Sequence, residues 1–397
     1  MLAGHYEKML QNKSVIRELS EFATARGKEI GYENVFDFSL GNPSVPVPEA
    51  VTETMIRLLK EENPVTLHGY SPSLGIPTVR EKIALSLEKR FGVPYRMEHI
   101  FMTSGAAGAI AHALRAVTVP GEEVLTFAPC FSEYFSYVNG TGAKLKMVPA
   151  DTETFQINFA AFEEMISEKV SAVLINTPNN PSGIVYSAET LGKLAAILHE
   201  KSEQFGHDIY IISDEPYREI VFAGVDAPFV SSFYENTIMC YSFSKSLSFP
   251  GERIGYVAVN PACSDSSKII QMCGQISRET GHNCPASLIQ LTVGEHLEET
   301  SDLSVYETNK KLLYQELKKL KFTCVEPGGT FYIFPKAMEE DAKVFCKKAL
   351  RYDLVLVPGD GFGCPGYFRM AYCIDTKKVE RSLSAMHTFV RNEGYIK

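Results

Sequence analysis

The sequence predicts an α/β protein in which a large domain with a doubly wound, mainly parallel sheet is followed by a smaller α+β domain. Between residues 99 and 259 the chain contains several short, β-branched, continuously apolar stretches, which are typical of strands buried on both faces. Helical patterns separate many of these stretches, as in a doubly wound sheet. After Gly281 the pattern changes to long helices and then short strands. A chain of 397 residues also exceeds what a single core usually supports.

The elements are expected in the following order. Apolar residues between positions 15 and 23 are spaced for one face of an N-terminal helix, and a turn-rich segment, residues 41–48, comes next. Later helices are predicted over residues 51–60, 79–90, 106–116, 188–201, 286–299 and 302–320. Strands are predicted over residues 99–102, 123–127, 144–148, 172–176, 209–214, 237–241, 254–259, 331–334 and 368–371. We expect an N-terminal segment (residues 1–44) associated with the small domain, a large domain (45–275) and a small C-terminal domain (276–397).

The composition excludes several classes of function. The formal net charge of −9 and the lack of a basic run argue against binding to nucleic acid or to a membrane surface. Nine scattered cysteines, odd in number and without a CxxC pair, fit reduced thiols in the cytoplasm better than disulfides or a zinc site. We expect no signal peptide, no membrane span and no metal, since the histidines show no metal-ligand spacing.

The segment of residues 242–256 predicts the chemistry best. Lys245 follows Ser242 and Ser244, and Arg253 comes eight residues after the lysine. A lysine amine forms a Schiff base with an aldehyde, while hydroxyls and a guanidinium suit a phosphate. Pyridoxal 5'-phosphate (PLP) carries both groups, so we predict a PLP site with Lys245 as a catalytic residue. The alternative is an ordinary surface loop.

A second segment predicts where the phosphate binds. Gly105, Ala106 and Ala107 lie between a predicted strand and a predicted helix. Small residues let backbone N–H groups approach an anion, and a helix N-terminus favours negative charge. Close packing of the strand against the helix would explain the same residues.

Polar and aromatic residues are predicted around the ring of the cofactor. Asp214 ends an apolar strand, where it can keep a pyridine nitrogen protonated, although a helix cap or a turn is the alternative. Tyr217 and Asn180 are predicted to hydrogen-bond the phenolic oxygen of the ring. Asn180 also fits a simple turn of Asn, Pro and Gly, and the two interpretations are compatible. Phe131 is predicted to stack on the ring, with Tyr134 as its rival.

The second domain contributes a candidate for substrate binding. Arg369 lies among aromatic residues in a predicted strand. A planar guanidinium binds a carboxylate through two parallel hydrogen bonds, so we predict that Arg369 holds the α-carboxylate of an amino acid. A structural salt bridge is the alternative. Residues 361–366 match a dinucleotide-binding string, but no βαβ unit surrounds them and Pro365 interrupts them, so we interpret them as a loop.

Together these motifs resemble the fold-type I PLP enzymes, aminotransferase class I/II, of the aspartate aminotransferase-like group. The resemblance spans nearly the whole chain, and its specificity comes from the order and spacing of the motifs. They occupy residues 41–48, 68–84, 103–110, 176–183, 213–217, 242–256, 358–363 and 368–372.

The resemblance implies roles that the residues alone do not. Tyr70 looks like the tyrosine that reaches the phosphate of the neighbouring subunit's cofactor, which implies a homodimer with shared active sites. Gly41 looks like the backbone contact beside the substrate carboxylate, on a segment that moves when the site closes. The family's phosphate ligands correspond to Ser242, Ser244, Arg253 and the turn of residues 105–107.

The chain also departs from the family pattern. The turn after Gly105 carries alanines where many relatives have a polar residue, so one side-chain contact to the phosphate is expected to be missing. Arg278 lies nearly where dicarboxylate-specific relatives carry an arginine that is donated across the dimer. We hypothesise that it binds the distal carboxylate of the substrate; a surface arginine on a loop is the alternative.

These observations predict a transaminase. It would move the amino group of an L-amino acid, with aspartate as a candidate, to a 2-keto acid by a ping-pong mechanism in which Lys245 is the general acid and base. A PLP-dependent β-C–S lyase, which performs β-elimination, shares the cofactor residues and is the alternative. A ligand-sensing regulator is a remote alternative, because only 40 residues precede the motif at Gly41.

Overall fold

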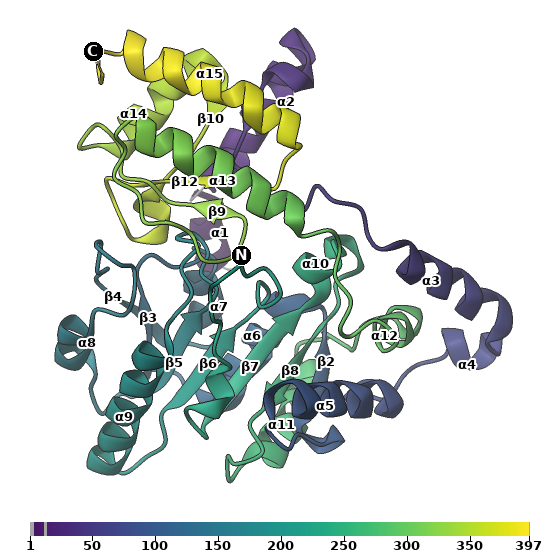
Figure 1. Ribbon diagram of the computed structural model, residues 1–397. Coiled ribbons are helices and arrows are strands. Elements are labelled where there is room, and N and C mark those ends of the chain that lie inside the picture. Colours follow the sequence, from purple (N-terminus) through teal and green to yellow (C-terminus); the bar gives the residue numbers. More distant parts are fainter. Residues whose placement is uncertain (1–3, 12–13, 397) are drawn as a thin grey trace.

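The computed structural model describes residues 4–11 and 14–396. Its large sheet has seven strands in the order β2-β8-β7-β6-β5-β3-β4. Strand β8 runs antiparallel to both of its neighbours, and the other neighbouring pairs are parallel. Smaller sheets and a group of helices lie above the large sheet (Figure 1). The predicted α/β class with a mainly parallel sheet is therefore confirmed.

The elements have the following bounds. The strands are β1 (Phe36–Asp37), β2 (Ile100–Thr103), β3 (Glu123–Phe127), β4 (Lys144–Val148), β5 (Val170–Asn176), β6 (Tyr210–Asp214), β7 (Thr237–Ser242), β8 (Gly255–Val259), β9 (Tyr332–Ile333), β10 (Leu354–Val355), β11 (Val357–Pro358) and β12 (Phe368–Ala371). The helices are α1 (Gly4–Gln11), α2 (Val15–Ile30), α3 (Glu49–Glu61), α4 (Pro64–His68), α5 (Pro77–Phe91), α6 (Gly105–Val117), α7 (Tyr134–Asn139), α8 (Phe159–Met165), α9 (Ala188–Phe205), α10 (Phe243–Ser246), α11 (Ser266–Glu279), α12 (Ser287–Val293), α13 (Ser304–Lys319), α14 (Ala342–Ala349) and α15 (Thr376–Asn392). None of the helices in the described ranges is long and apolar enough to cross a bilayer.

The large sheet is wound on both faces, and strand β5 shows why. Every residue of β5 is buried. Leu174 packs in one core cluster with residues of α6. Val173, which points to the opposite face of the strand, packs in another cluster with residues of α9. Because both faces are covered by helices, the strand is a continuous apolar run rather than an alternating one.

The small domain combines a three-stranded antiparallel sheet, in the order β11-β12-β9, with the parallel pair β1 and β10. Helices α13 and α15 pack against one another, and their buried faces share one core cluster with strand β12. Strand β1 brings residues 36 and 37 of the N-terminal segment onto β10. The domain boundaries near residues 45 and 276 stay predictions. Helix α12, from the predicted small domain, packs against α3, α4 and α5.

Several elements differ from the sequence prediction, and helices α11 and α15 are among those that were not predicted. The helix predicted over residues 286–299 ends at Val293. The next residue, Gly294, lies so close to α5 that an added Cβ would come within 3.2 Å of Val79, and glycine is a poor helix former. The strands β1, β10 and β11 were not predicted, because two residues are too few to show a periodicity.

Candidate active site

A cavity of about 370 Å³ lies where the carboxyl ends of the central strands face the small domain. Strand β5 ends at Asn176, β6 at Asp214 and β7 at Ser242, so three neighbouring parallel strands deliver polar side chains to one edge of the sheet. The small domain adds Tyr332 of β9 and Arg369 of β12 to the wall of the cavity. The site therefore depends on both sheets.

Among the residues that the structure describes, Lys245 is the one lysine that lines this cavity. It lies in the short helix α10, directly after β7, and its Nζ donates a hydrogen bond of 2.8 Å to the backbone oxygen of Gly41. The pKa of the Lys245 amine is lowered to about 8, mainly by burial and to a smaller extent by the charges of Arg253 and Arg369, while Cys373 acts in the opposite direction. Near neutral pH, a useful fraction of this amine is therefore neutral and able to act as a nucleophile or a base.

Asp214 is a buried carboxyl with one oxygen to spare. Its Oδ2 accepts a 2.6 Å hydrogen bond from the hydroxyl of Tyr134. Its Oδ1 is buried and has no hydrogen-bond partner within the described ranges. Burial raises the pKa of Asp214 to about 7; the hydrogen bond from Tyr134 opposes this shift and the charge of Glu215 adds to it. The free oxygen suits a donor that enters the cavity, and a positively charged donor most of all.

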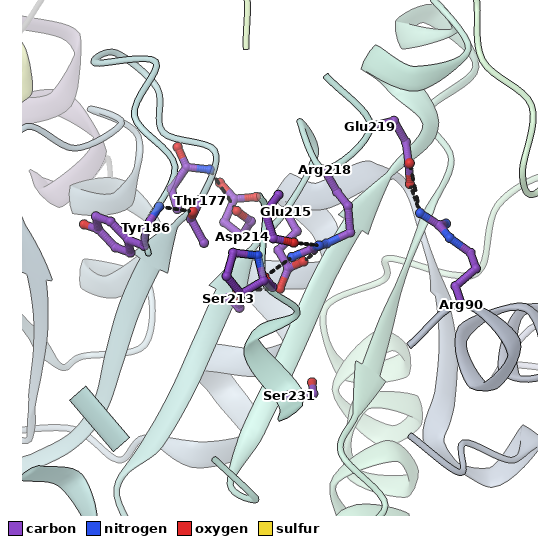
Figure 2. Close-up of polar contacts among 12 residues, drawn as sticks. Arg90, Thr177, Tyr186, Ser213, Asp214, Glu215, Arg218, Glu219 and Ser231 are labelled. Carbon is purple, nitrogen blue, oxygen red and sulfur yellow. Dashed lines mark hydrogen bonds and ion pairs between the residues drawn. The ribbon is translucent and has the colours of Figure 1, made fainter. Parts of the chain in front are cut away.

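A buried ion pair lies beside Asp214 (Figure 2). The side chains of Glu215 and Arg218 are 0% and 4% exposed and are bonded to each other. Arg218 also donates to two backbone oxygens, and its guanidinium lies over the rings of Phe91 and Phe229, at 5.4 and 5.3 Å from their centroids. Because Arg218 neutralises Glu215, the end of β6 does not carry two unpaired buried carboxylates.

The turn at the start of α6 faces two serines and an arginine. Gly105 has a φ of 78°, and a Cβ there would lie 3.0 Å from the Nη2 of Arg253 and 3.5 Å from the Oγ of Ser242. The Oγ of Ser242 donates to that of Ser244 at 2.7 Å. The guanidinium of Arg253 is fixed by the backbone oxygens of Pro250 and Ser104, at 2.9 and 3.3 Å. Backbone N–H groups, hydroxyls and a cation thus surround a small space that suits an anion.

Arg369 is held in place for a ligand. Its Nη1 donates to Oδ1 of Asn180 at 3.0 Å and its Nη2 to the backbone oxygen of Ser39 at 2.5 Å. Its Nε is buried without a partner among the described residues. The guanidinium lies over the rings of Tyr332 and Phe362, at 4.6 and 4.9 Å from their centroids. A planar cation fixed in this way, with one donor unused, is suited to a carboxylate.

The comparison with known families decides the class of protein. The family model described as aminotransferase class I and II matches residues 33–386. The chain belongs to the class I and II aminotransferases. The protein is therefore an amino-acid aminotransferase, and the enzymes of this family use PLP.

Several relatives of this aminotransferase match it along almost the whole chain. The aspartate aminotransferase of Thermotoga maritima is 30% identical, with 91% of this chain and 92% of the relative covered. Aromatic-amino-acid aminotransferase 2 of Thermococcus litoralis is also 30% identical, with 97% of each covered. A solved aminotransferase structure from Eubacterium rectale has a TM-score of 0.97 and 42% identity, with 99% of each chain covered.

The aminotransferase brings most of the predicted site residues together. Those that line the cavity are Gly41, Ala106, Ala107, Phe131, Asn180, Asp214, Tyr217, Ser242, Ser244, Lys245, Arg253 and Arg369. Phe131 lines the cavity, whereas its rival Tyr134 is fully buried. The hydroxyl of Tyr217 pairs with that of Tyr332 at 3.1 Å.

Gly105 does not itself line the cavity, although it lies next to Arg253 and Ser242, which do. Two further predicted residues lie apart from the cavity within this chain. Tyr70 is fully exposed, and Arg278 is exposed near the end of α11. Conversely, Ile16, Leu40, Ile110, Tyr137, Asn176 and Tyr332 line the cavity and were not predicted as site residues. Asn176 ends a predicted strand, as Asp214 does, so the strand-end argument applied to it as well. The other five are aromatic or aliphatic, and their sequence signal is that of ordinary core residues.

The raised pKa of Asp214 makes the stability of the cofactor-free protein depend on pH. In the unfolded chain this carboxyl loses its proton near its ordinary pKa of 3.8, but in the folded chain it keeps the proton until about pH 7. Between these values the unfolded state binds fewer protons, so this group lowers stability as the pH rises. Asp214→Asn should therefore gain stability over the native protein by up to about 1.4 kcal/mol per pH unit between pH 4 and 7.

Urea unfolding of both cofactor-free proteins at several pH values measures this difference. Asp226→Asn, in an exposed loop, controls for the loss of a carboxylate at the surface. A stability difference that stays constant between pH 4 and 7 would contradict the raised pKa of Asp214.

The buried ion pair of Glu215 and Arg218 leads to a second prediction. Arg218→Met leaves a fully buried carboxylate without its partner and should cost about 3–5 kcal/mol of stability. Adding Glu215→Gln should recover most of this loss, because the uncompensated charge is removed. A double-mutant cycle from urea unfolding measures the coupling. Arg57→Met is the control: its ion pair with Glu295 is partly exposed to solvent, so about 1 kcal/mol or less is expected. Additive effects of the two buried substitutions would contradict the coupling.

Proposed function

We propose that the protein is a PLP-dependent aminotransferase that moves the amino group of an L-amino acid to a 2-keto acid by a ping-pong mechanism, with Lys245 as its central catalytic residue. The observation that carries this proposal is the buried amine of Lys245, with its lowered pKa, in one cavity with the free oxygen of Asp214 and the fixed guanidinium of Arg369. The names of the relatives support an amino acid as the donor.

The residues of the cavity fit PLP. The turn of Gly105, Ala106 and Ala107, with Ser242, Ser244 and Arg253, would hold its phosphate. The unpartnered Oδ1 of Asp214 would accept from its pyridine nitrogen, Tyr217 and Asn180 would reach its phenolic oxygen, and Phe131 would stack on its ring. When bound, PLP supplies a ring that withdraws electrons from the α-carbon of the substrate.

The chain's own residues would bind and orient the substrate and move one proton. Arg369, supported by Asn180, would clamp the α-carboxylate, and Gly41 would add a backbone contact beside it. The Nζ of Lys245 would remove the proton from the α-carbon, since its lowered pKa leaves it partly neutral near pH 8. Tyr134 would keep the Asp214 carboxylate oriented through its hydrogen bond at Oδ2.

Assembly and substrate choice extend the proposal. We propose a cytoplasmic homodimer in which Tyr70 reaches the phosphate of the neighbouring subunit's cofactor. The complete exposure of Tyr70 within one chain supports this arrangement. Aspartate is a candidate donor because relatives from Thermotoga maritima and Pyrococcus abyssi are named aspartate aminotransferases. Arg278, also exposed, would reach its distal carboxylate across the dimer.

Lys245→Ala tests the catalytic assignment. Removing the amine should lower the rate of keto-acid formation from the amino donor by about 10²- to 10⁴-fold, since a general base is lost. Lys268→Ala, on the exposed face of α11, is the control and should retain full activity. For the native enzyme, coupled assays measure the formation of both products. Release of pyruvate and ammonia without a keto-acid acceptor would instead identify the β-lyase, and unchanged turnover in Lys245→Ala would refute the assignment.

Arg278→Ala tests the substrate assignment. If Arg278 binds a distal carboxylate, kcat/KM for aspartate should fall by about 10- to 100-fold, because a charge-assisted hydrogen bond is lost. The value for alanine, which has no second carboxylate, should not change. Arg391→Ala, at an exposed position of α15, is the matched control. An equal loss on both substrates, no loss on either, or a monomer in sedimentation would contradict the role of Arg278.

A further inference from the structure

The phosphate turn of this chain offers few side-chain donors. Ala106 and Ala107 present only methyl groups to the cavity, so the turn itself supplies backbone N–H groups alone. The hydroxyl of Ser242 already donates to Ser244, and both terminal nitrogens of Arg253 already bind backbone oxygens. A phosphate monoester has three strongly accepting terminal oxygens, each of which can take more than one hydrogen bond.

Tyr137 is a side chain without an assigned role on helix α7, which packs against α6. It lines the cavity together with Ala106, Ala107 and Ile110 of α6. Tyr137 follows Tyr134 by three residues in α7, and residues at this spacing share one face of a helix. Since Tyr134 points to the carboxylate of Asp214, the same face of α7 directs Tyr137 toward the site.

The hydroxyl of Tyr137 is unused by the protein. It makes no hydrogen bond to any other residue in the described ranges, although the residue is partly buried. Burial raises the pKa of Tyr137 to about 12, with Glu133 and Asp214 adding to the shift and Arg253 opposing it. The hydroxyl therefore lies within electrostatic reach of both Arg253 and Asp214, and it keeps its proton at neutral pH.

We propose that the hydroxyl of Tyr137 donates a hydrogen bond to the phosphate of the cofactor and so supplies the side-chain contact that Ala106 and Ala107 cannot make. The inference rests on the proposed function, since it assumes that PLP occupies this cavity. It assigns a donor from α7 to a phosphate site that is otherwise built from α6, the end of β7, α10, the loop before β8 and the proposed contact of Tyr70 from the neighbouring subunit.

Tyr137→Phe tests the proposal through cofactor affinity, which does not depend on turnover. The dissociation constants of PLP and of pyridoxal, which lacks the phosphate, are measured by spectroscopic titration of the cofactor-free native protein and the variant. Loss of a charge-assisted hydrogen bond should weaken PLP binding by about 10- to 100-fold and leave pyridoxal binding unchanged. Tyr352→Phe removes a hydroxyl that bonds Glu393 in the small domain, and it should change neither constant.

The outcomes separate the two proposals. A native protein that does not bind PLP would refute the proposed function itself. If the native protein binds PLP, two results would overturn the role of Tyr137 alone. The Tyr137→Phe variant would bind both PLP and pyridoxal as tightly as the native protein does, or it would lose affinity for both equally. A second variant, Ala106→Ser in the Tyr137→Phe background, should recover part of the lost affinity for PLP, because it returns a hydroxyl to the turn. The thermal melt of each cofactor-free variant confirms that it is folded.

Discussion

The carboxyl of Asp214, buried at the end of the central strand β6, is the group on which the arrangement of the site depends. An unpaired buried carboxylate is costly, and burial accordingly raises its pKa to about 7. Tyr134 stabilises one oxygen, and the other is left for a ligand. The neighbouring Glu215 would add a second buried charge, and the protein offsets it with Arg218, which packs near the stacked rings of Phe91 and Phe229. Of the two carboxylates at this strand end, Glu215 is therefore paired, and Asp214 keeps one acceptor oxygen, Oδ1, free.

The second requirement is that the two domains meet in one place. Arg369 belongs to the small sheet, but it bonds Asn180 in the loop after β5, and Lys245 of the large domain bonds the backbone of Gly41 in the N-terminal segment. Each side chain that would touch the substrate is thus held by a partner from another part of the chain. Cations fixed by hydrogen bonds and aromatic faces lose little side-chain entropy on binding a carboxylate, which favours specific recognition.

The sequence predicted those features that local chemistry determines. Strands β3 and β4 begin and end at the predicted residues. All five residues of β3 are buried and leave a continuous signal, whereas β4, at the edge of the sheet, alternates exposed lysines with partly buried apolar residues. Lys245, Asp214 and Arg253 could be identified because their residue types suit a stated chemistry at a strand end or a turn. Tyr137 and Ile16 could not be identified as site residues. An aromatic or aliphatic residue in a helix looks like an ordinary core residue in the sequence, and only the packing of the helices shows that it faces a cavity. Tyr70 and Arg278 carried no local signal and depended on the resemblance to the family.

One physical cause, burial, acts on the two titrating groups of the cavity in opposite directions. It lowers the pKa of the Lys245 amine to about 8 and raises that of the Asp214 carboxyl to about 7, so that both approach neutrality from opposite sides. In water the two groups would differ by several pH units and would both be charged at pH 7. Two groups poised near neutrality respond strongly to a change in the charge around them, and a cationic ring nitrogen bound beside Asp214, as we propose, would be such a change. Under that proposal, the same burial would make the amine available as a base and the carboxyl responsive to the cofactor.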